Sequence, residues 1–488
     1  MFIEKDGKNK NFYKYFITFV IGCLFVLMLF LVKGSFIQIS DYSITYIDII
    51  FCTVIIMLFL GLFFIRNKVD SKKILIALII LGLFLRIIYA FSIHSIPISD
   101  FAIMYETAGD VLKGDFSNLW GNGYIARFPH ITIPVLYFSA IRFIFENNSL
   151  LVIKLISVIA SSCNILLGYL IIKEVFKERF KANVVALIIA LYPPLILYTA
   201  VYTTENLAIP LYLLGIYLFI LVCNGKRGSK TLFLAATVIS LGNLFRMVGQ
   251  VIIIALILYL IVSYRAALKK KLAAILIVIL GFLIPLVGIS SILHYSGIIE
   301  YQLWGGSEPS ITNVVKGLNV EYEGRWNPDD AKIPEDCNFD YELIEEKSKT
   351  IIHERLTNTP TSTLVKFFIN KYTSQWRVGD FSGSYWAEHS ISDDEIGFKY
   401  SENGIWYGQM FHFIIICLVY IGLFNLKEIR ENRIISLFYY IFCGYGLLYL
   451  VSENQARYGF VVCWIFIFMA SSGIDLLKKL IIKIKEKV

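Results

Sequence analysis

Apolar stretches of membrane-spanning length recur along this chain, separated by short polar connectors. A helix needs about 20 mainly apolar residues to cross a hydrocarbon core about 30 Å thick. Because lipid offers no partners for free backbone N–H and C=O groups, such stretches are expected to be helical. They predict twelve transmembrane helices, near residues 15–33, 46–65, 74–92, 150–172, 183–200, 204–222, 231–246, 249–264, 271–291, 404–424, 433–451 and 459–477.

The basic residues between these stretches set the predicted orientation, because cytoplasmic loops of membrane proteins carry an excess of Lys and Arg. The short amphipathic stretch Ile131–Phe145 is expected on the outer surface, since a further crossing there would reverse every later loop. Twelve crossings then place both termini and all basic connectors in the cytoplasm: Arg66–Lys73, Lys173–Lys181, Asn224–Lys230, Arg265–Lys271, Asn425–Arg433 and the tail from Lys478.

The composition supports a membrane protein and argues against a nucleic-acid partner. Of 488 residues, 57% are hydrophobic and 17% are charged, whereas soluble domains carry about a quarter charged residues. The formal charge of +8 is unevenly spread: residues 297–402 hold 10 Lys and Arg against 19 Asp and Glu. The positive charge therefore lies in the short connectors, which is a pattern of membrane topology.

The predicted fold is an all-α, multi-pass protein of the plasma membrane with four parts. Residues 1–73 form two N-terminal helices, and residues 74–291 form a transmembrane core with a first outer loop at 93–149. Residues 292–403 form a large acidic outer loop, and residues 404–488 form three helices and a basic tail. No CxxC pair is present, and the large loop contains a single cysteine, so neither disulfides nor cysteine-bound metal are predicted.

Charged residues at the predicted outer helix ends are the candidates for chemistry, because charges at a membrane are costly. Asp100 is either a general base toward an acceptor or a cap of the helix that follows it. Glu205 is either a second catalytic carboxylate or a helix-start charge. Arg246 either binds phosphate or reaches to lipid headgroups. Arg457 either binds phosphate or pairs with nearby Glu453.

Two carboxylates and two guanidiniums on one face of a membrane can bind a phosphorylated lipid headgroup and activate an acceptor. Arg127, in the motif Tyr124–Pro129, is expected to join them from the first outer loop. Tyr105, Glu453 and Tyr458 are the neighbouring candidates for substrate contact. The histidines have no metal-ligand spacing, and the sequence contains no phosphate-binding glycine loop or nucleophile elbow.

The order of these features resembles a known family. Its markers are the span with Arg86, Ser99-Asp100, Tyr105, Gly114-Asp115, Arg127-Phe128-Pro129, an amphipathic helix, a basic loop, Tyr192-Pro193-Pro194 before Thr204-Glu205, and Asn243–Arg246. The chain is similar to the C-type (GT-C) glycosyltransferases of the protein O-mannosyltransferase and lipid A aminoarabinose-transferase group. The similarity covers residues 74–291 and the Glu453–Tyr458 loop.

This resemblance implies transfer of a sugar from a polyprenyl-phosphate donor to a protein, lipid or cell-envelope glycan at the outer membrane face, with inversion. It implies Asp100 as the catalytic carboxylate, Glu205 as the second acidic residue, and Arg127 and Arg246 as ligands of the donor phosphate, beside Arg457. Relatives often have an Asp-Glu pair in the first loop, whereas Phe101 follows Asp100 here. A divalent cation, Mg²⁺ or Mn²⁺, stays open, as do the sugar and the acceptor.

Two other classes remain as alternatives. A lipid-linked polysaccharide polymerase or ligase would fail to use a single-sugar monophosphate donor. A lipid or solute transporter typically carries its binding residues near the bilayer midplane, whereas the charges here gather at the predicted outer rim.

Overall fold

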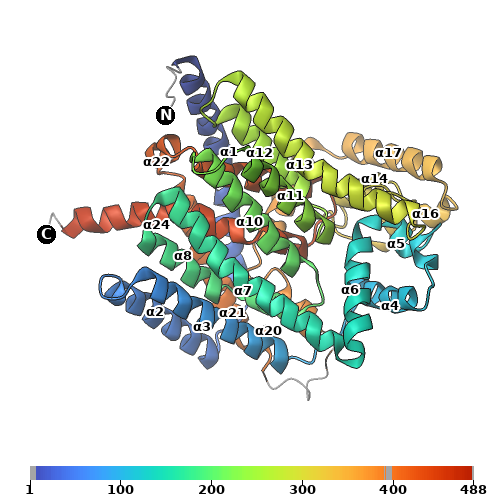
Figure 1. Ribbon diagram of the computed structural model, residues 1–488, viewed down its shortest axis with the longest axis horizontal. Coiled ribbons are helices and arrows are strands. Elements are labelled where there is room, and N and C mark those ends of the chain that lie inside the picture. The colour runs from blue at the N-terminus through green and yellow to red at the C-terminus, as the bar shows by residue number, and fades with distance from the viewer. Residues whose placement is uncertain (1–6, 390, 392–397, 486–488) are drawn as a thin grey trace.

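The computed structural model describes residues 7–389, 391 and 398–485. Within these ranges every regular element is a helix, from α1 (Gly7–Ser40) to α24 (Trp464–Lys485). In Figure 1 the first turns of α1 and the end of α24 lie on the left, whereas α4 (Asp100–Leu112) and α17 (Tyr341–Asn358) lie on the right. The predicted all-α architecture is confirmed.

Seven helical stretches of the described chain are long and apolar enough to cross a membrane. They include α2 (Tyr46–Ile65), α3 (Ser71–Ser92), α10 (Glu205–Cys223), α13 (Leu268–Tyr295) and α21 (Ile405–Gly422). The other two are Asn11–Ser40, within α1, and Pro129–Phe176, which ends in α7 (Ser149–Phe176).

Five further predicted spans coincide with less regular or shorter helices. Two are helix pairs bent by 57° and 63°: α8 (Arg179–Leu191) with Pro193–Ala200, and Ala456–Val462 with Trp464–Lys478. Three are shorter apolar helices: α11 (Ser229–Phe245), α12 (Gly249–Val262) and α23 (Ile435–Val451). Every predicted span thus has a helical counterpart, and twelve crossings remain a prediction.

The helix α6 (Thr132–Phe145) is the amphipathic stretch that the sequence places on the outer surface. It is separated from α7 by Glu146, whose φ of +41° interrupts the helix. One face packs on α4 (Asp100–Leu112), where the Ser139 hydroxyl donates to the Ala108 carbonyl at 3.0 Å. The other face exposes Phe143 and Ile144. This two-sided character suits a helix at an interface, and its outer position remains a prediction.

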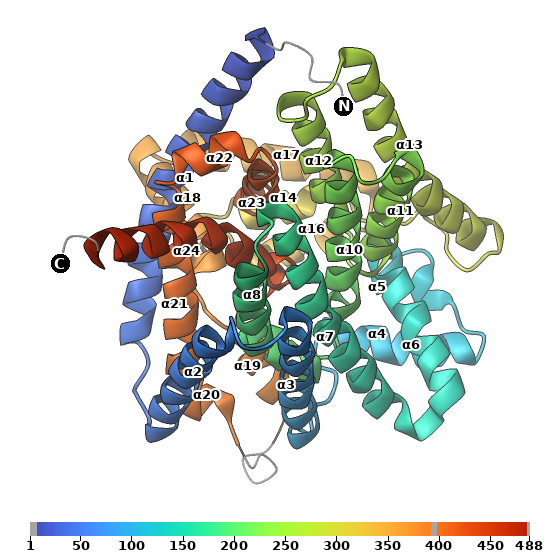
Figure 2. The ribbon, with the colours of Figure 1, turned by 60° about the vertical axis from the view of Figure 1, so that its left-hand side comes forward.

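Close helix packing is clear where α11 lies against both α10 and α13 (Figure 2). At Gly215 of α10, an added Cβ would lie 2.8 Å from the Ala235 carbonyl oxygen of α11. Only glycine permits this approach, which is typical of membrane helices that associate through small residues.

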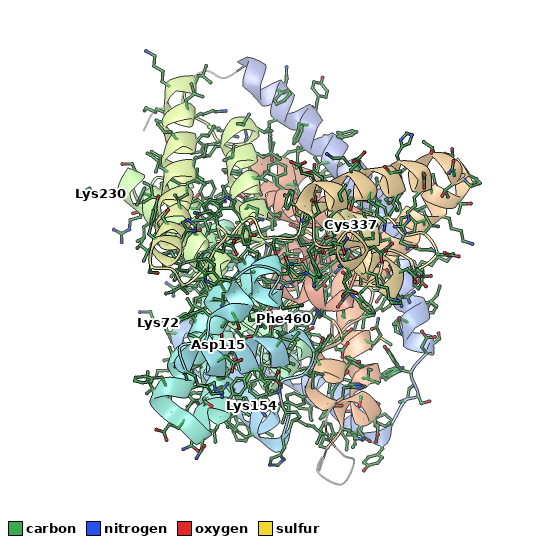
Figure 3. All side chains as sticks on the ribbon, turned by 90° about the vertical axis from the view of Figure 1, so that its right-hand side faces the viewer. Lys72, Asp115, Lys154, Lys230, Cys337 and Phe460 are labelled. Carbon is green, nitrogen blue, oxygen red and sulfur yellow. The ribbon has the colours of Figure 1, made fainter. Side chains whose placement is uncertain are left out.

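Two large loops, residues 93–148 and 296–404, meet at one end of the bundle, called here the loop-bearing end. They are joined by the Ser307 amide, which donates to the Ala126 carbonyl at 3.0 Å. The second loop contains α14 (Ile311–Gly317), α17 (Tyr341–Asn358), α18 (Thr361–Trp376) and α19 (Gly383–Glu388). A small apolar core of Val315, Ile333, Cys337 and Ile344 stabilises it, and Cys337 is labelled within this loop in Figure 3.

The predicted orientation can be tested by labelling single cysteines in a background that lacks the native ones. Lys177 follows α7 and Lys349 lies on α17, and both side chains are exposed. In intact cells a membrane-impermeant maleimide should label Lys349→Cys and spare Lys177→Cys until the membrane is permeabilised. Equal labelling of both positions in intact cells would contradict the orientation and the placement of α6.

Candidate active site

Four charged residues predicted from the sequence meet as two ion pairs at the loop-bearing end. Asp100 is the first residue of α4, and Glu205 is the first residue of α10. Arg246 directly follows α11, and Arg457 lies in η6 (Ala456–Val462), a short 3-10 helix. Each side chain therefore projects from a helix terminus, where the chain enters or leaves the bundle.

Both carboxylate oxygens of Asp100 accept hydrogen bonds. Arg457 donates from Nη2 to Oδ2 at 2.6 Å, and the Tyr124 hydroxyl donates to Oδ1 at 3.0 Å. The preceding residue, Ser99, has φ +52° and ψ −131°, a strained conformation for a residue with a Cβ. No side-chain cap closes the start of α4 at Ser99. The carboxylate of Asp100 is thus directed at Arg457 and Tyr124.

The electrostatic surroundings keep Asp100 ionised. Burial acts to raise the pKa of Asp100, but the Arg457 guanidinium, the Tyr124 hydroxyl and the Arg246 charge together hold it below its ordinary value. Burial and the neighbouring Asp100 charge raise the pKa of Tyr124, so its hydroxyl stays protonated and donates. Asp100 is consequently a carboxylate at neutral pH and is able to accept a proton.

The second ion pair joins Glu205 Oε1 to Arg246 Nε at 3.3 Å. The Thr203 hydroxyl donates to the other Glu205 oxygen, and the position of Glu205 at a helix N-terminus favours its negative charge. Arg246 is fixed through its backbone, because the Tyr212 hydroxyl donates to its carbonyl oxygen. The Thr204 hydroxyl donates to the preceding Phe245 carbonyl at 2.6 Å, which ties the two halves of this pair together.

Aromatic rings bring the two pairs into one site. The guanidinium carbons of Arg246 and Arg457 lie 5.4 and 5.3 Å from the centre of the Tyr458 ring. Arg457 also lies 4.4 Å from the Trp386 ring of α19. The Tyr458 hydroxyl donates to Glu453 Oε1 at 3.0 Å. Stacking on rings holds a guanidinium plane in place without neutralising its charge.

The loop before η6 is held by Lys371 of α18. The lysine Nζ donates to the carbonyls of Leu450 at 2.9 Å and Ser452 at 2.7 Å, and also to that of Gly317. Burial lowers the pKa of Lys371 to about 7. This lysine links α18, α14 and the end of α23, and thereby supports the segment that carries Glu453 and Arg457.

Two predicted site residues make other contacts. Arg127 donates from Nε and Nη2 to Glu308 Oε2, at 2.8 and 2.6 Å, and so joins the two large loops. The Tyr105 hydroxyl is 2.7 Å from the Ser149 hydroxyl, and its ring lies 4.4 Å from the Arg142 guanidinium. Neither residue contacts the two ion pairs.

Sequence reasoning missed Tyr124, Trp386 and Lys371. Tyr124 belongs to the same motif as Arg127, so this motif is the sequence signal that could have identified it. Trp386 and Lys371 lie in the acidic loop, where no periodicity or spacing distinguishes them. Within the described residues no group of three or more His, Cys, Asp or Glu side chains could hold a metal ion.

Part of the chain matches the model of a known protein family. Residues 133–289 match the family model described as dolichyl-phosphate-mannose-protein mannosyltransferase. This match confirms the resemblance drawn from the sequence. The mannosyltransferase match contains Glu205 and Arg246, whereas Asp100 and Arg457 lie outside it. No curated protein sequence matches the chain significantly.

Three solved structures are similar to this chain at low identity. The Archaeoglobus fulgidus oligosaccharyltransferase AglB, in complex with an inhibitory peptide and a dolichol-phosphate, has 12% identity and a TM-score of 0.45, covering 86% of this chain and 52% of its own. The apo form of an oligosaccharyltransferase from the same organism has 13% identity and a TM-score of 0.46, covering 84% of this chain and 51% of its own. ArnT from Cupriavidus metallidurans, bound to undecaprenyl phosphate, has 11% identity and a TM-score of 0.36, covering 83% of this chain and 78% of its own. The chain thus spans about half the length of the oligosaccharyltransferases.

Proposed function

We propose that this chain is a membrane glycosyltransferase that moves a sugar from a polyprenyl-phosphate donor to an acceptor at the outer face of the membrane. The observation that carries this proposal is the meeting of Asp100, Glu205, Arg246 and Arg457 at the loop-bearing end. The mannosyltransferase match at residues 133–289 supports the same class of reaction. In this reaction Asp100 is the general base, and Arg246 and Arg457 bind the donor phosphate.

The proposed reaction is one displacement at the anomeric carbon of the sugar. The acceptor oxygen or nitrogen loses its proton to Asp100 and forms a bond to the anomeric carbon, while the bond between that carbon and the phosphate oxygen breaks. The bonding pair leaves with the polyprenyl phosphate. Because the acceptor attacks opposite the leaving phosphate, the configuration at the anomeric carbon inverts. A positioned base of this kind contributes about 10²–10⁴-fold to a rate.

The two guanidiniums suit the leaving phosphate. Arginine donates bidentately to phosphate, and charge that develops on a leaving group is best stabilised by donors already in place. The buried Nε of Arg457 has no hydrogen-bond partner within residues 7–389, 391 and 398–485. A phosphate oxygen would satisfy this donor. Arg246 and Arg457 lie over the same Tyr458 ring, whereas Arg127 pairs with Glu308 between the two large loops. We therefore assign the phosphate to Arg246 and Arg457, with Tyr458 and Glu453 keeping those side chains in place.

Donor class is the direct test of this function. The purified chain in lipid nanodiscs should transfer radiolabelled sugar from undecaprenyl or dolichyl monophosphate donors to membranes of the cells that express it. Matched diphosphate-linked glycans should be inert. Transfer from the diphosphate donors alone would instead indicate a polymerase or ligase, and inertness of every donor would refute the proposal.

The Asp100–Arg457 pair makes a prediction about pH. Asp100 must be deprotonated to act as a base, and Arg457 holds its pKa below the ordinary value. The acid limb of kcat/KM should therefore lie below about pH 4, the usual range of an aspartate. Arg457→Gln removes this stabilisation of the carboxylate, so the limb should move to higher pH. Arg127→Gln is the matched control and should leave the limb unchanged; a limb that stays in place in Arg457→Gln would contradict the role of Asp100.

A further inference from the structure

Arg86 is completely buried inside the helix bundle and is not among the residues assigned to the reaction above. It lies on α3, a helix apolar enough to cross the membrane. A charged side chain at such a position is costly unless its donors are satisfied. The contacts of Arg86 therefore need a physical explanation.

The hydrogen bonds of Arg86 in the described chain go to neutral oxygen atoms. Nη1 donates to the carbonyls of Gly82 at 3.0 Å and Ala190 at 3.2 Å. Nη2 donates to the Ile189 carbonyl at 3.0 Å, and Nε donates to the Ser161 hydroxyl at 2.9 Å. Arg86 thus connects its own helix to α7 and to the last turn of α8.

These two carbonyls of α8 are among those in its last turn that lack helical partners. In an α-helix the carbonyl of residue i accepts from the amide of residue i+4. The partners of Ile189 and Ala190 would be Pro193 and Pro194, which have no N–H group. Arg86 supplies the donors that these prolines remove, and its charge lies at the negative end of the α8 dipole.

Ser161 extends this support beyond the break. Its hydroxyl accepts from Arg86 Nε and donates to the Leu195 carbonyl at 2.6 Å, within α9 (Pro193–Leu197). Gly82 permits the close approach of the helices, because an added Cβ there would lie 3.1 Å from Arg86 Nη1 and 2.2 Å from Ile165 Cδ1. Both arms of the 57° bend are consequently fixed to α3 and α7.

The bent segment leads directly to both ion pairs of the site. Tyr198, which follows α9, stacks on Phe460 with ring centres 3.6 Å apart and an interplanar angle of 6°. Phe460 belongs to η6 together with Arg457, and it is labelled near the middle of the molecule in Figure 3. The Tyr198 carbonyl also accepts from Asn206 Nδ2 at 2.8 Å, beside Glu205. The direction of the chain after the bend therefore sets the positions of Glu205 and Arg457.

We propose that Arg86 is a positioning residue: by replacing the amide donors that Pro193 and Pro194 lack, it fixes the α8–α9 bend and the placement of Glu205 and Arg457. Its effect on catalysis rests on the proposed glycosyltransferase function, whereas its link to the two prolines does not. The two parts can therefore be tested separately on the full chain in nanodiscs.

The first measurement is thermal stability in two backgrounds. In the wild-type background Arg86→Met should lower the Tm by about 5 °C or more, because two buried carbonyls lose their donors. With Pro193→Ala and Pro194→Ala, backbone amides return to α8, so the same change should lower the Tm by about 1 °C. Equal losses in both backgrounds would overturn the proposal. If Arg86→Met fails to fold, recovery of a folded protein in the alanine background is the expected result, and failure there would overturn it.

The second measurement is kcat per folded molecule. Arg86→Lys keeps the charge but lacks the fork that reaches both carbonyls, so kcat should fall about tenfold or more. The matched control is Lys271→Met, which removes another buried cation that donates to a helix-end carbonyl, that of Ile261 at 2.8 Å. This control should lose stability and keep kcat. An Arg86→Lys protein with wild-type kcat would refute the positioning role, and a wild type without transferase activity would refute the function alone.

Discussion

Asp100→Asn is expected to lower kcat about 10³-fold while undecaprenyl phosphate binds more tightly than to the wild type. The two effects have one cause. Asp100 forms an ion pair with Arg457 at 2.6 Å, so the catalytic carboxylate and the proposed donor phosphate compete for the same guanidinium. Asparagine keeps the size of the side chain but removes the charge, which leaves Arg457 without its counter-ion.

The size of the tightening follows from this competition. A buried guanidinium that has lost its carboxylate partner is destabilised, so binding of another anion beside it becomes more favourable. We expect the Kd for undecaprenyl phosphate to fall about tenfold, which corresponds to about 1.4 kcal/mol. Equilibrium binding to the purified variant and single-turnover transfer measure the two effects independently.

Glu308→Gln is the matched control for Asp100→Asn. It also removes a carboxylate from an arginine, in the Arg127–Glu308 pair between the two large loops. Because this pair lies outside the proposed phosphate site, lipid-phosphate binding should change less than about twofold. If Asp100→Asn weakens binding in parallel with kcat, Asp100 supports the structure of the site and the proposed base is wrong.

Loss of either guanidinium is the second large effect. Arg246→Gln and Arg457→Gln should each lower kcat/KM for the donor about 10²–10³-fold, because each removes a donor that stabilises the leaving phosphate. The kcat/KM of Arg457→Lys for the donor should lie between those of the wild type and Arg457→Gln, since lysine keeps the charge but cannot stack on Trp386 and Tyr458. Steady-state kinetics with a monophosphate donor give these values.

Arg127→Gln distinguishes a phosphate site from a general need for positive charge. Arg127 lies in the first large loop and is bound by Glu308, outside the two ion pairs of the site, so its loss should change kcat/KM for the donor less than about threefold. A loss as large as that of Arg246→Gln would show that the donor phosphate extends to Arg127, and the assignment of two guanidiniums would then be wrong.

The helices were predictable from sequence because a bilayer allows few alternatives. A span must satisfy its backbone internally, so each apolar stretch became a helix near the expected residues. The breaks were harder to predict, although the sequence contained their cause. The 57° bend follows from Pro193 and Pro194, which remove two amides. The donors that compensate come from Arg86, more than a hundred residues earlier.

The four charged members of the candidate site were predictable from sequence, but their pairings were not. Topology alone placed Asp100, Glu205, Arg246 and Arg457 on one face, because each ends or begins a helix there. Sequence proximity suggested that Arg457 pairs with Glu453. In the structure Arg457 contacts Asp100, and Glu453 accepts from Tyr458 and Gln455. Long-range pairing depends on how the loops fold over the bundle, and hydropathy carries no information on that.

A structure of the chain in nanodiscs with bound undecaprenyl phosphate tests the central claim most directly. The account predicts that the phosphate lies within hydrogen-bond distance of Arg246 and Arg457, and that the Asp100 carboxylate is displaced from Arg457 and faces the open side of the site. A phosphate bound away from both guanidiniums, with the Asp100–Arg457 pair intact, would contradict it.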